Sequence, residues 1–236
     1  MRWTTIIWVL AFSIAMGFLE AAVVVYLREL YYPNGFDFPL REMDMDIMTV
    51  ELFREAATLI MLLSVGFIAA SKKIERLAYF VLAFAVWDIC YYLFLKLTLG
   101  WPESLITWDI LFLLPVTWVG PVITPVINSL TMILLCFSIL YFSAKGIKAG
   151  LSSREWILFV LGSLIVIFAY IQDYSGYMLE RFSFWDFIFV RDEDAVLAHA
   201  SLYIPRHFNW YIFSTGQLLF FLAIANYILR LRKAEA

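Results

Sequence analysis

Six runs of about twenty mostly apolar residues dominate this chain of 236 residues. A helix of about 20 apolar residues is long enough to cross the hydrocarbon core of a bilayer, and it satisfies its own backbone hydrogen bonds there. The composition agrees, because 64% of the residues are apolar or aromatic and only 16% are charged, against roughly a quarter in soluble domains. We therefore predict an all-α integral membrane protein in which residues 1–236 form a single transmembrane helical bundle. The six predicted spans are residues 5–27, 50–70, 77–98, 122–143, 156–172 and 209–229.

The charges between the spans predict how the chain is oriented. The segments on the side of both termini carry ten Lys and Arg residues against three acids, and those on the opposite side carry six against fourteen. Because positively charged loops stay in the cytoplasm, both termini are expected to be cytoplasmic. Short connecting segments favour a plasma membrane, and a prokaryotic inner membrane in particular.

Four charged side chains fall inside the predicted spans: Glu20, Arg54, Glu55 and Asp88. A charge at membrane depth costs at least a few kcal/mol, so such residues usually face the bundle interior and have partners. In the predicted orientation all four lie at the midplane or in the extracytoplasmic half. Three carboxylates facing one arginine predict that at least one is protonated, reaches Lys96 or holds a cation.

Polar positions one helical turn apart extend this candidate site. Asp88, Tyr92 and Lys96 are spaced by four residues, and so are Glu51 and Glu55, so each set lies on one helix face. A buried carboxyl group is suited to donate or accept a proton. The candidate catalytic residues are Glu55, Asp88 and Glu20. The candidate ligand-binding residues are Arg54, Lys96, Glu51, Tyr92, Trp101, Trp108, Asp109 and Gln217.

Residues 103–118 join the third and fourth spans and are too short to cross a membrane. Ser104 is a suitable helix N-cap and Pro115 ends any helix begun there, so we predict a short helix in the extracytoplasmic interface. A second interfacial helix is predicted at residues 176–190. With residues 31–47 these helices would cover the polar site. The alternative is an aromatic belt at the membrane surface with a tight crossover.

The sequence assigns no metal and no cofactor. It contains no H-x-x-x-H, H-E-x-x-H or E-x-x-H spacing, and no motif for haem, flavin, nicotinamide or ATP. A metal, if bound, would draw on oxygen and imidazole ligands. The candidate ligands are Glu20, Glu51, Glu55, Asp88, Asp109, His199 and His207.

Two functions of different classes fit these features. The first is a membrane-embedded enzyme or binding protein for an amphiphilic ligand, such as a lipid headgroup, an isoprenoid or a quinone, that enters from the extracytoplasmic leaflet. The intramembrane carboxylates would handle protons, while Arg54 and Lys96 would hold an anionic or carbonyl group. The second is a cofactor-free accessory subunit of a larger membrane complex, such as a respiratory or electron-transfer complex, whose acidic face docks a basic soluble protein.

Three further functional classes are transport, a purely structural role and nucleic-acid binding. A transporter is disfavoured, because transport needs polar groups accessible from both faces and the cytoplasmic halves of the spans are mostly apolar. Alternatively, the polar residues form a purely structural ion-pair and hydrogen-bond network that holds four helices together in the surrounding lipids and binds no ligand. The sequence shows no basic patch of the kind that binds nucleic acid.

Overall fold

The computed structural model describes residues 2–188 and 193–235. It is 73% helical, and six of its helices are long and apolar enough to cross a membrane, which confirms the predicted multi-pass helical character. The six helices are α1 (Trp3–Tyr31), α2 (Met45–Ala69), α3 (Lys73–Leu99), α4 (Ile123–Ala144), α5 (Ser153–Leu179) and α8 (Trp210–Glu235).

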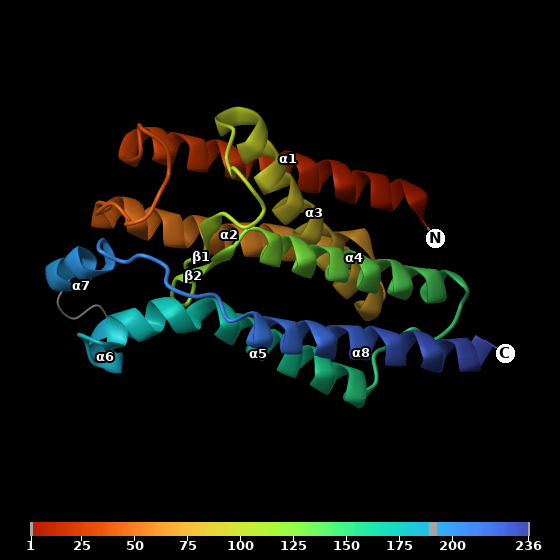
Figure 1. Cartoon of the computed structure of the whole chain (residues 1–236). Helices are drawn as coiled ribbons and strands as arrows, with labels where there is room; N and C mark the ends of the chain where they lie inside the picture. Colours follow the sequence, from red (N-terminus) through yellow and green to blue (C-terminus); the bar gives the residue numbers. More distant parts are fainter. Residues whose placement is uncertain (1, 189–192, 236) are drawn as a thin grey trace.

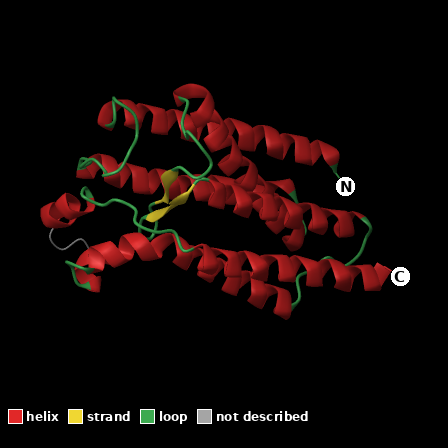
Figure 2. Ribbon diagram, viewed as in Figure 1, coloured by secondary structure: helices red, strands yellow, loops and turns green. Residues whose placement is uncertain are grey.

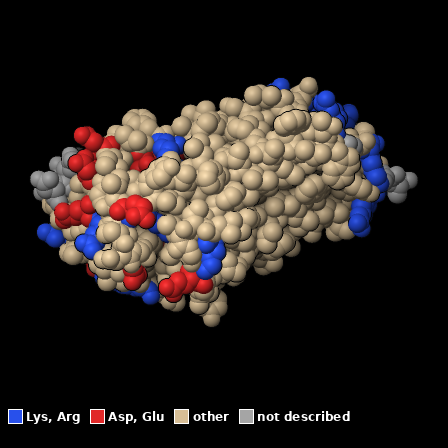
Figure 3. Space-filling model, turned by 90° about the horizontal axis from the view of Figure 1, so that it is seen from above, with Lys and Arg blue, Asp and Glu red and all other residues tan. Residues whose placement is uncertain are grey.

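Both chain ends lie at the same end of the bundle, which we call the termini end, and α7 (Glu193–Ala200) lies at the other, which we call the α7 end (Figure 1). Figure 3 shows a wide belt free of charged side chains between these two ends. Lys and Arg are seen at the termini end, whereas acidic side chains gather at the α7 end. The positive-inside rule still predicts that the termini end is cytoplasmic.

The helices pack in two groups. Helix α3 contacts α1, α2 and α4, whereas α5 packs along α8, and α4 and the second strand of a hairpin join the two groups. Glycines allow the closest approaches: a Cβ atom added to Gly17 would lie 2.8 Å from Cys90 Cβ on α3, and one added to Gly216 would lie 2.6 Å from Val166 Cγ2 on α5. Small residues at such contacts let helix backbones approach closely in a membrane, where van der Waals packing drives association.

Residues 103–118 do not form the predicted interfacial helix. They contain β1 (Trp108–Phe112), which pairs antiparallel with β2 (Trp118–Pro121) and places Asp109 opposite Gly120 (Figure 2). Asp109 is buried, whereas the other four residues of β1 are only partly buried. In the hairpin, backbone N–H and C=O groups form hydrogen bonds between two strands. In a short helix ended by Pro115, the same groups would need partners within one short segment.

The other two predicted covering segments differ from expectation as well. The first part of residues 176–190 continues α5 as far as Leu179, and only the five-residue α6 (Phe184–Ile188) is a separate helix. Residues 189 and 190 lie outside the described part of the chain. Residues 32–44 form a loop that links α1 to α2. The helix α7 was not predicted.

Candidate functional site

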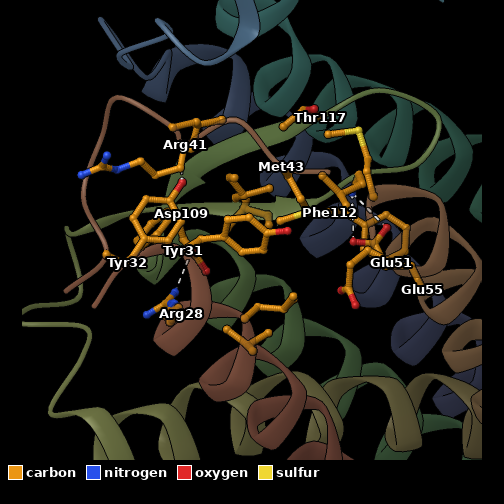
Figure 4. Close-up of a pocket in the computed structure, with 18 of the residues that line it drawn as sticks. Arg28, Tyr31, Tyr32, Arg41, Met43, Glu51, Glu55, Asp109, Phe112 and Thr117 are labelled. Atoms are coloured by element: carbon orange, nitrogen blue, oxygen red, sulfur yellow. Dashed lines mark hydrogen bonds and ion pairs between the residues drawn. The ribbon is translucent and has the colours of Figure 1, made fainter. Parts of the chain in front are cut away.

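A cavity of about 210 Å³ lies in the half of the bundle near the α7 end, among α1, α2, α3, the hairpin and α7 (Figure 4). Each helix lines it with one face, as the helical period requires. Glu20, Val24 and Arg28 come from α1 at intervals of four, and Glu51 and Glu55 come from α2. The side chains Glu20, Arg54, Glu55 and Asp88, which the sequence singled out from three different spans, all line this cavity.

One arginine on α2 binds two carboxylates. The Nε atom of Arg54 donates to Glu51 Oε2 at 2.7 Å, and its Nη1 donates to Glu20 Oε1 on α1. The hydroxyl of Thr58 donates to the other oxygen of Glu20 at 3.2 Å. The guanidinium is therefore already paired on two sides, so Arg54 is poorly placed to hold an anionic ligand.

Two further carboxyl groups at the cavity have neutral partners. The backbone N–H of Leu113 donates to both oxygens of Glu55, at 3.0 and 3.2 Å, and the hydroxyl of Ser129 donates to Asp88 Oδ2 at 2.8 Å. Both carboxyl residues are buried, with 7% of Glu55 and 9% of Asp88 exposed. Among the described residues neither forms an ion pair. These two groups are the ones left to interact with a molecule in the cavity.

A second buried ion pair lies on another side of the cavity and joins α1 to the hairpin (Figure 4). Arg28 Nη2 donates to Asp109 Oδ1 at 3.4 Å, and the hydroxyl of Tyr92 donates to Asp109 Oδ2 at 3.1 Å. The Arg28 guanidinium lies 3.7 Å from the centre of the Trp101 ring, a cation–π contact. Burial raises the pKa of the Asp109 carboxyl group, which lies outside the six spanning helices, to about 6, although Arg28 and Tyr92 both lower it.

Sequence reasoning missed Arg28, because the predicted first span ends at residue 27. Helix α1 continues to Tyr31, so Arg28 is a buried helical residue. Its spacing of eight residues from Glu20 places both on one helix face, and this was the signal available in the sequence. Trp87 was also missed, although it immediately precedes Asp88 and lines the same cavity.

Lys96, which the sequence placed in the ligand-binding set, does not line the cavity. Its Nζ atom donates to the backbone carbonyls of Gly100 and Pro102, both at 2.8 Å. These contacts fix the chain just beyond the C-terminus of α3, where carbonyl groups lack helical partners and a cation is favoured. In the structure Lys96 therefore caps a helix end, and neither Glu55 nor Asp88 pairs with it.

Three other predicted ligand-binding residues also lie outside the cavity lining. The Trp101 ring makes the cation–π contact with Arg28, and Trp108 packs edge-on against Phe208, with 6.2 Å between the ring centres. Gln217 accepts a hydrogen bond from Thr131 at 3.3 Å and donates to Asn128, in a separate polar contact between α4 and α8. By contrast Tyr92, Glu51 and Asp109 do line the cavity.

Neither histidine lines the cavity. His199 stacks on Tyr177 at the α7 end, with ring centres 4.3 Å apart, and His207 is exposed. Within residues 2–188 and 193–235 no three His, Cys, Asp or Glu side chains are grouped as a metal site would need. Five of the candidate metal ligands line the cavity, namely Glu20, Glu51, Glu55, Asp88 and Asp109, but no three of them lie close enough together to hold a metal ion.

The termini half of the bundle also holds a buried carboxylate, which the sequence had placed in a loop. Glu155 is fully buried in the first turn of α5, where it forms a capping box with Ser152. Its oxygens accept hydrogen bonds from Arg230 at 2.8 Å and from Asn226 at 3.1 Å. This cluster ties α5 to α8, and every carboxylate oxygen in it has a charged or polar donor.

The cavity thus combines carboxyl groups that can bind or exchange protons with fixed hydrogen-bond donors and with aromatic walls. Comparison with protein-family models, with curated proteins and with solved structures finds no match for this chain. The function is therefore inferred from the chemistry of the cavity itself.

Proposed function

We propose that this cavity binds the polar head of an amphiphilic molecule from the membrane, and that Glu55 and Asp88 exchange protons with it. The observation that carries the proposal is the pair of buried carboxyl groups with neutral partners that face one cavity from two helices. A structural network would pair such groups with a cation, as Arg54 pairs with Glu20 and Arg230 with Glu155.

The walls of the cavity suit a molecule that is partly apolar. Aromatic and aliphatic side chains from α1, α2, α3, the hairpin, α7 and the loop of residues 32–44 make up most of the lining, including Val24, Leu27, Tyr31, Phe36, Met43, Met48, Trp87, Tyr91, Ile110, Phe112 and Leu197. A few polar groups in an otherwise apolar concave surface are typical of small-molecule sites, in which the polar groups fix the orientation.

The packing of the helices also suits entry from the bilayer. Both α1 and α2 pack on α3, but they contact each other much less than either contacts α3. The two helices are joined by residues 32–44, whose Leu40, Arg41 and Met43 line the cavity from the α7 end. A ligand head would pass between α1 and α2 while its apolar tail stays in the leaflet at this end, which the charge distribution predicts to be extracytoplasmic.

The test is the retention of amphiphiles by the purified full chain. Protein in lipid nanodiscs is analysed by native mass spectrometry, with the variants Glu55→Gln and Asp88→Asn. The control is Glu29→Gln, the same change at an exposed position on α1 outside the cavity lining. Wild type and control are expected to retain a bound amphiphile that both cavity variants lose. Equal retention by all four proteins, each shown to be folded by thermal unfolding, would refute the proposal.

The proton step has its own readout. Infrared difference spectra recorded on ligand binding should show a change in the carboxylic C=O stretching band of the wild type. The change should be reduced in Glu55→Gln or Asp88→Asn and preserved in Glu29→Gln. If a ligand binds without any change in this band, the binding part of the proposal stands and the proton exchange is refuted.

The accessory-subunit function is a second candidate, favoured by one feature of α2. Only 22% of the most apolar stretch of α2 is buried, against 44% for α4. Phe53, Ile60 and Phe67 are exposed on its free face, where either lipid or another subunit would cover them. Purification under native conditions separates the two functions, since a subunit co-purifies with other membrane proteins in fixed ratio and an independent protein does not.

A further inference from the structure

The charges around the cavity do not balance. Five buried carboxyl groups line it from α1, α2, α3 and β1, but only two largely buried arginines accompany them. Arg41 and Glu42 also line it, but both are exposed and their charges offset each other. The carboxyl groups are those of Glu20, Glu51, Glu55, Asp88 and Asp109, and the arginines are Arg28 and Arg54. A buried charge without a partner is costly, because protein atoms replace its water shell incompletely. A positively charged group in the cavity would reduce this cost.

The excess negative charge is concentrated near one part of the cavity. Within the described part of the chain Arg28 pairs only with Asp109, so that side is neutral when both are ionised. Arg54 has two carboxylate partners, so its cluster keeps one negative charge, and Glu55 follows Arg54 directly on the same helix. Asp88 lines the cavity from α3. A cation is thus favoured near Glu55 and Asp88.

Aromatic rings on α3 suit an organic cation. The cavity is lined by three aromatic residues of α3 that lie within about one helical turn of Asp88: Trp87, Tyr91 and Tyr92. Aromatic faces attract ammonium groups, and sites that combine rings with a carboxylate are used to bind alkylated amines. An alkylammonium group gains from the rings and the carboxylates together.

Two buried donors in the same lining have no acceptor among the described residues: Arg28 Nη1 and Trp87 Nε1. Each of the two side chains is more than nine-tenths buried, with 7% of Arg28 and 6% of Trp87 exposed. Both are held in place, because Arg28 lies between Asp109 and the Trp101 ring, and the Trp87 ring packs on Phe84. A buried donor without an acceptor costs about 1–3 kcal/mol, so each of these two groups calls for an oxygen atom supplied by a ligand.

We propose that the ligand head carries a protonated amine, bound by Glu55 and Asp88, and oxygen acceptors, of which one is bound by Arg28 and another by Trp87. This inference rests on the proposed function and specifies its ligand as an amine that bears a phosphate, carboxylate or carbonyl oxygen. The same chemistry occurs in a lipid head of the ethanolamine type and in a soluble amine, and the experiment distinguishes these sources.

The first part of the experiment compares three heads on one tail. Dodecylamine, dodecanol and dodecanoate are titrated into the full chain in phosphatidylglycerol nanodiscs, with empty discs subtracted, and tryptophan fluorescence is recorded. Saturable binding of dodecylamine is expected, weakened about tenfold in Glu55→Gln, the loss of about one charge-assisted contact. It should be unchanged in the control Glu29→Gln.

The second part tests the oxygen acceptor and the source of the amine. The variant Trp87→Phe keeps an aromatic ring but removes the indole N–H. It should therefore weaken the binding of lysophosphatidylethanolamine several-fold more than the binding of dodecylamine, which has no oxygen. Phosphoethanolamine provides the same head without a tail. Binding of the tailed compound alone identifies a lipid head, and equally strong binding of phosphoethanolamine identifies a soluble amine.

The outcomes separate the inference from the proposed function. If dodecanol or dodecanoate binds as well as dodecylamine, the inference that the site requires an amine is refuted, but the proposal of a site for amphiphiles stands. If phosphoethanolamine binds as tightly as its tailed form, the inference that the ligand carries an amine stands, but the proposal that the ligand is an amphiphile is refuted. If none of these compounds binds with saturation, both proposals fail. An equal effect of Trp87→Phe on both amines refutes the oxygen acceptor.

Discussion

Replacing Arg54 by glutamine is the sharpest structural test of the charge network beside the cavity. Arg54 holds Glu51 on its own helix and Glu20 on α1, so it connects two helices that otherwise contact each other little. Glutamine keeps a similar length and a hydrogen-bond donor but removes the charge. The two carboxylates then remain buried, with Thr58 as the neutral donor to Glu20.

The expected cost follows from the burial of these groups. Removing one partner of a buried ion pair destabilises a protein by about 3–5 kcal/mol, because the remaining charge stays away from water. The side chains of Glu20 and Glu51 are 9% and 8% exposed, whereas that of Arg54 is 20% exposed. Partial screening of Arg54 favours the lower limit, so we expect a loss of about 3 kcal/mol, or roughly a hundredfold change in the unfolding equilibrium.

The assay is equilibrium unfolding of the full chain in mixed micelles, with increasing SDS and tryptophan fluorescence as the signal. The control is Arg206→Gln, because Arg206 pairs with Glu180 at 2.9 Å but both side chains are more than half exposed. Water screens such a pair, so its loss should have little effect. The double variant Glu20→Gln/Arg54→Gln should recover part of the stability lost by Arg54→Gln. If Arg54→Gln destabilises no more than Arg206→Gln, the network is not a buried ion cluster.

Three further predictions concern other parts of the molecule. Asp109 has a pKa of about 6 in the fold, above its unfolded value of about 3.9. The folded state therefore binds more protons between about pH 4 and 6, and Asp109 lowers stability as the pH rises through that window. Wild type should therefore lose about 3 kcal/mol of unfolding free energy relative to Asp109→Asn between pH 4 and 7, because asparagine does not titrate. A difference between the two proteins that does not change with pH would contradict this. Gly216→Ala places a methyl group against α5 and should cost about 1–3 kcal/mol; Gly176→Ala, with no neighbour within 4 Å, should cost nothing, and equal unfolding curves would disprove the close approach. Glu155→Gln keeps the capping geometry but loses the Arg230 pair, so it should lower stability without changing amphiphile retention.

Much of the helical architecture could be predicted because the bilayer imposes it. The six apolar runs became the six long helices, and the charged residues inside them turn toward one another. The spacing of Glu51 and Glu55 placed both on the cavity face of α2, and Glu20, Arg54 and Asp88 joined them from other spans. Each of these results depends on the cost of placing charge or unpaired backbone in lipid, which residue type alone reveals.

The connecting segments could not be predicted in the same way. Residues 103–118 carry a helix N-cap at Ser104 and a helix-ending Pro115, yet Trp108–Phe112 forms a strand because it pairs with β2. Lys96 lies one turn from Tyr92, yet it turns to the carbonyls beyond the end of α3. Arg28 has the helical spacing of Glu20, but whether it lies inside or outside the membrane depends on where α1 ends.

The sequence by itself determined that the chain crosses a membrane through six helices and that its intramembrane charges must seek partners, since both follow from transfer free energies that are properties of single residues. Only the tertiary structure decided which charge meets which. It gave Arg54 two carboxylates, gave Asp109 the unforeseen Arg28, and left Glu55 and Asp88 without a cation among the residues that the structure describes. Such pairing depends on distances of a few ångströms between helices far apart in the chain, and no local pattern in the sequence encodes them.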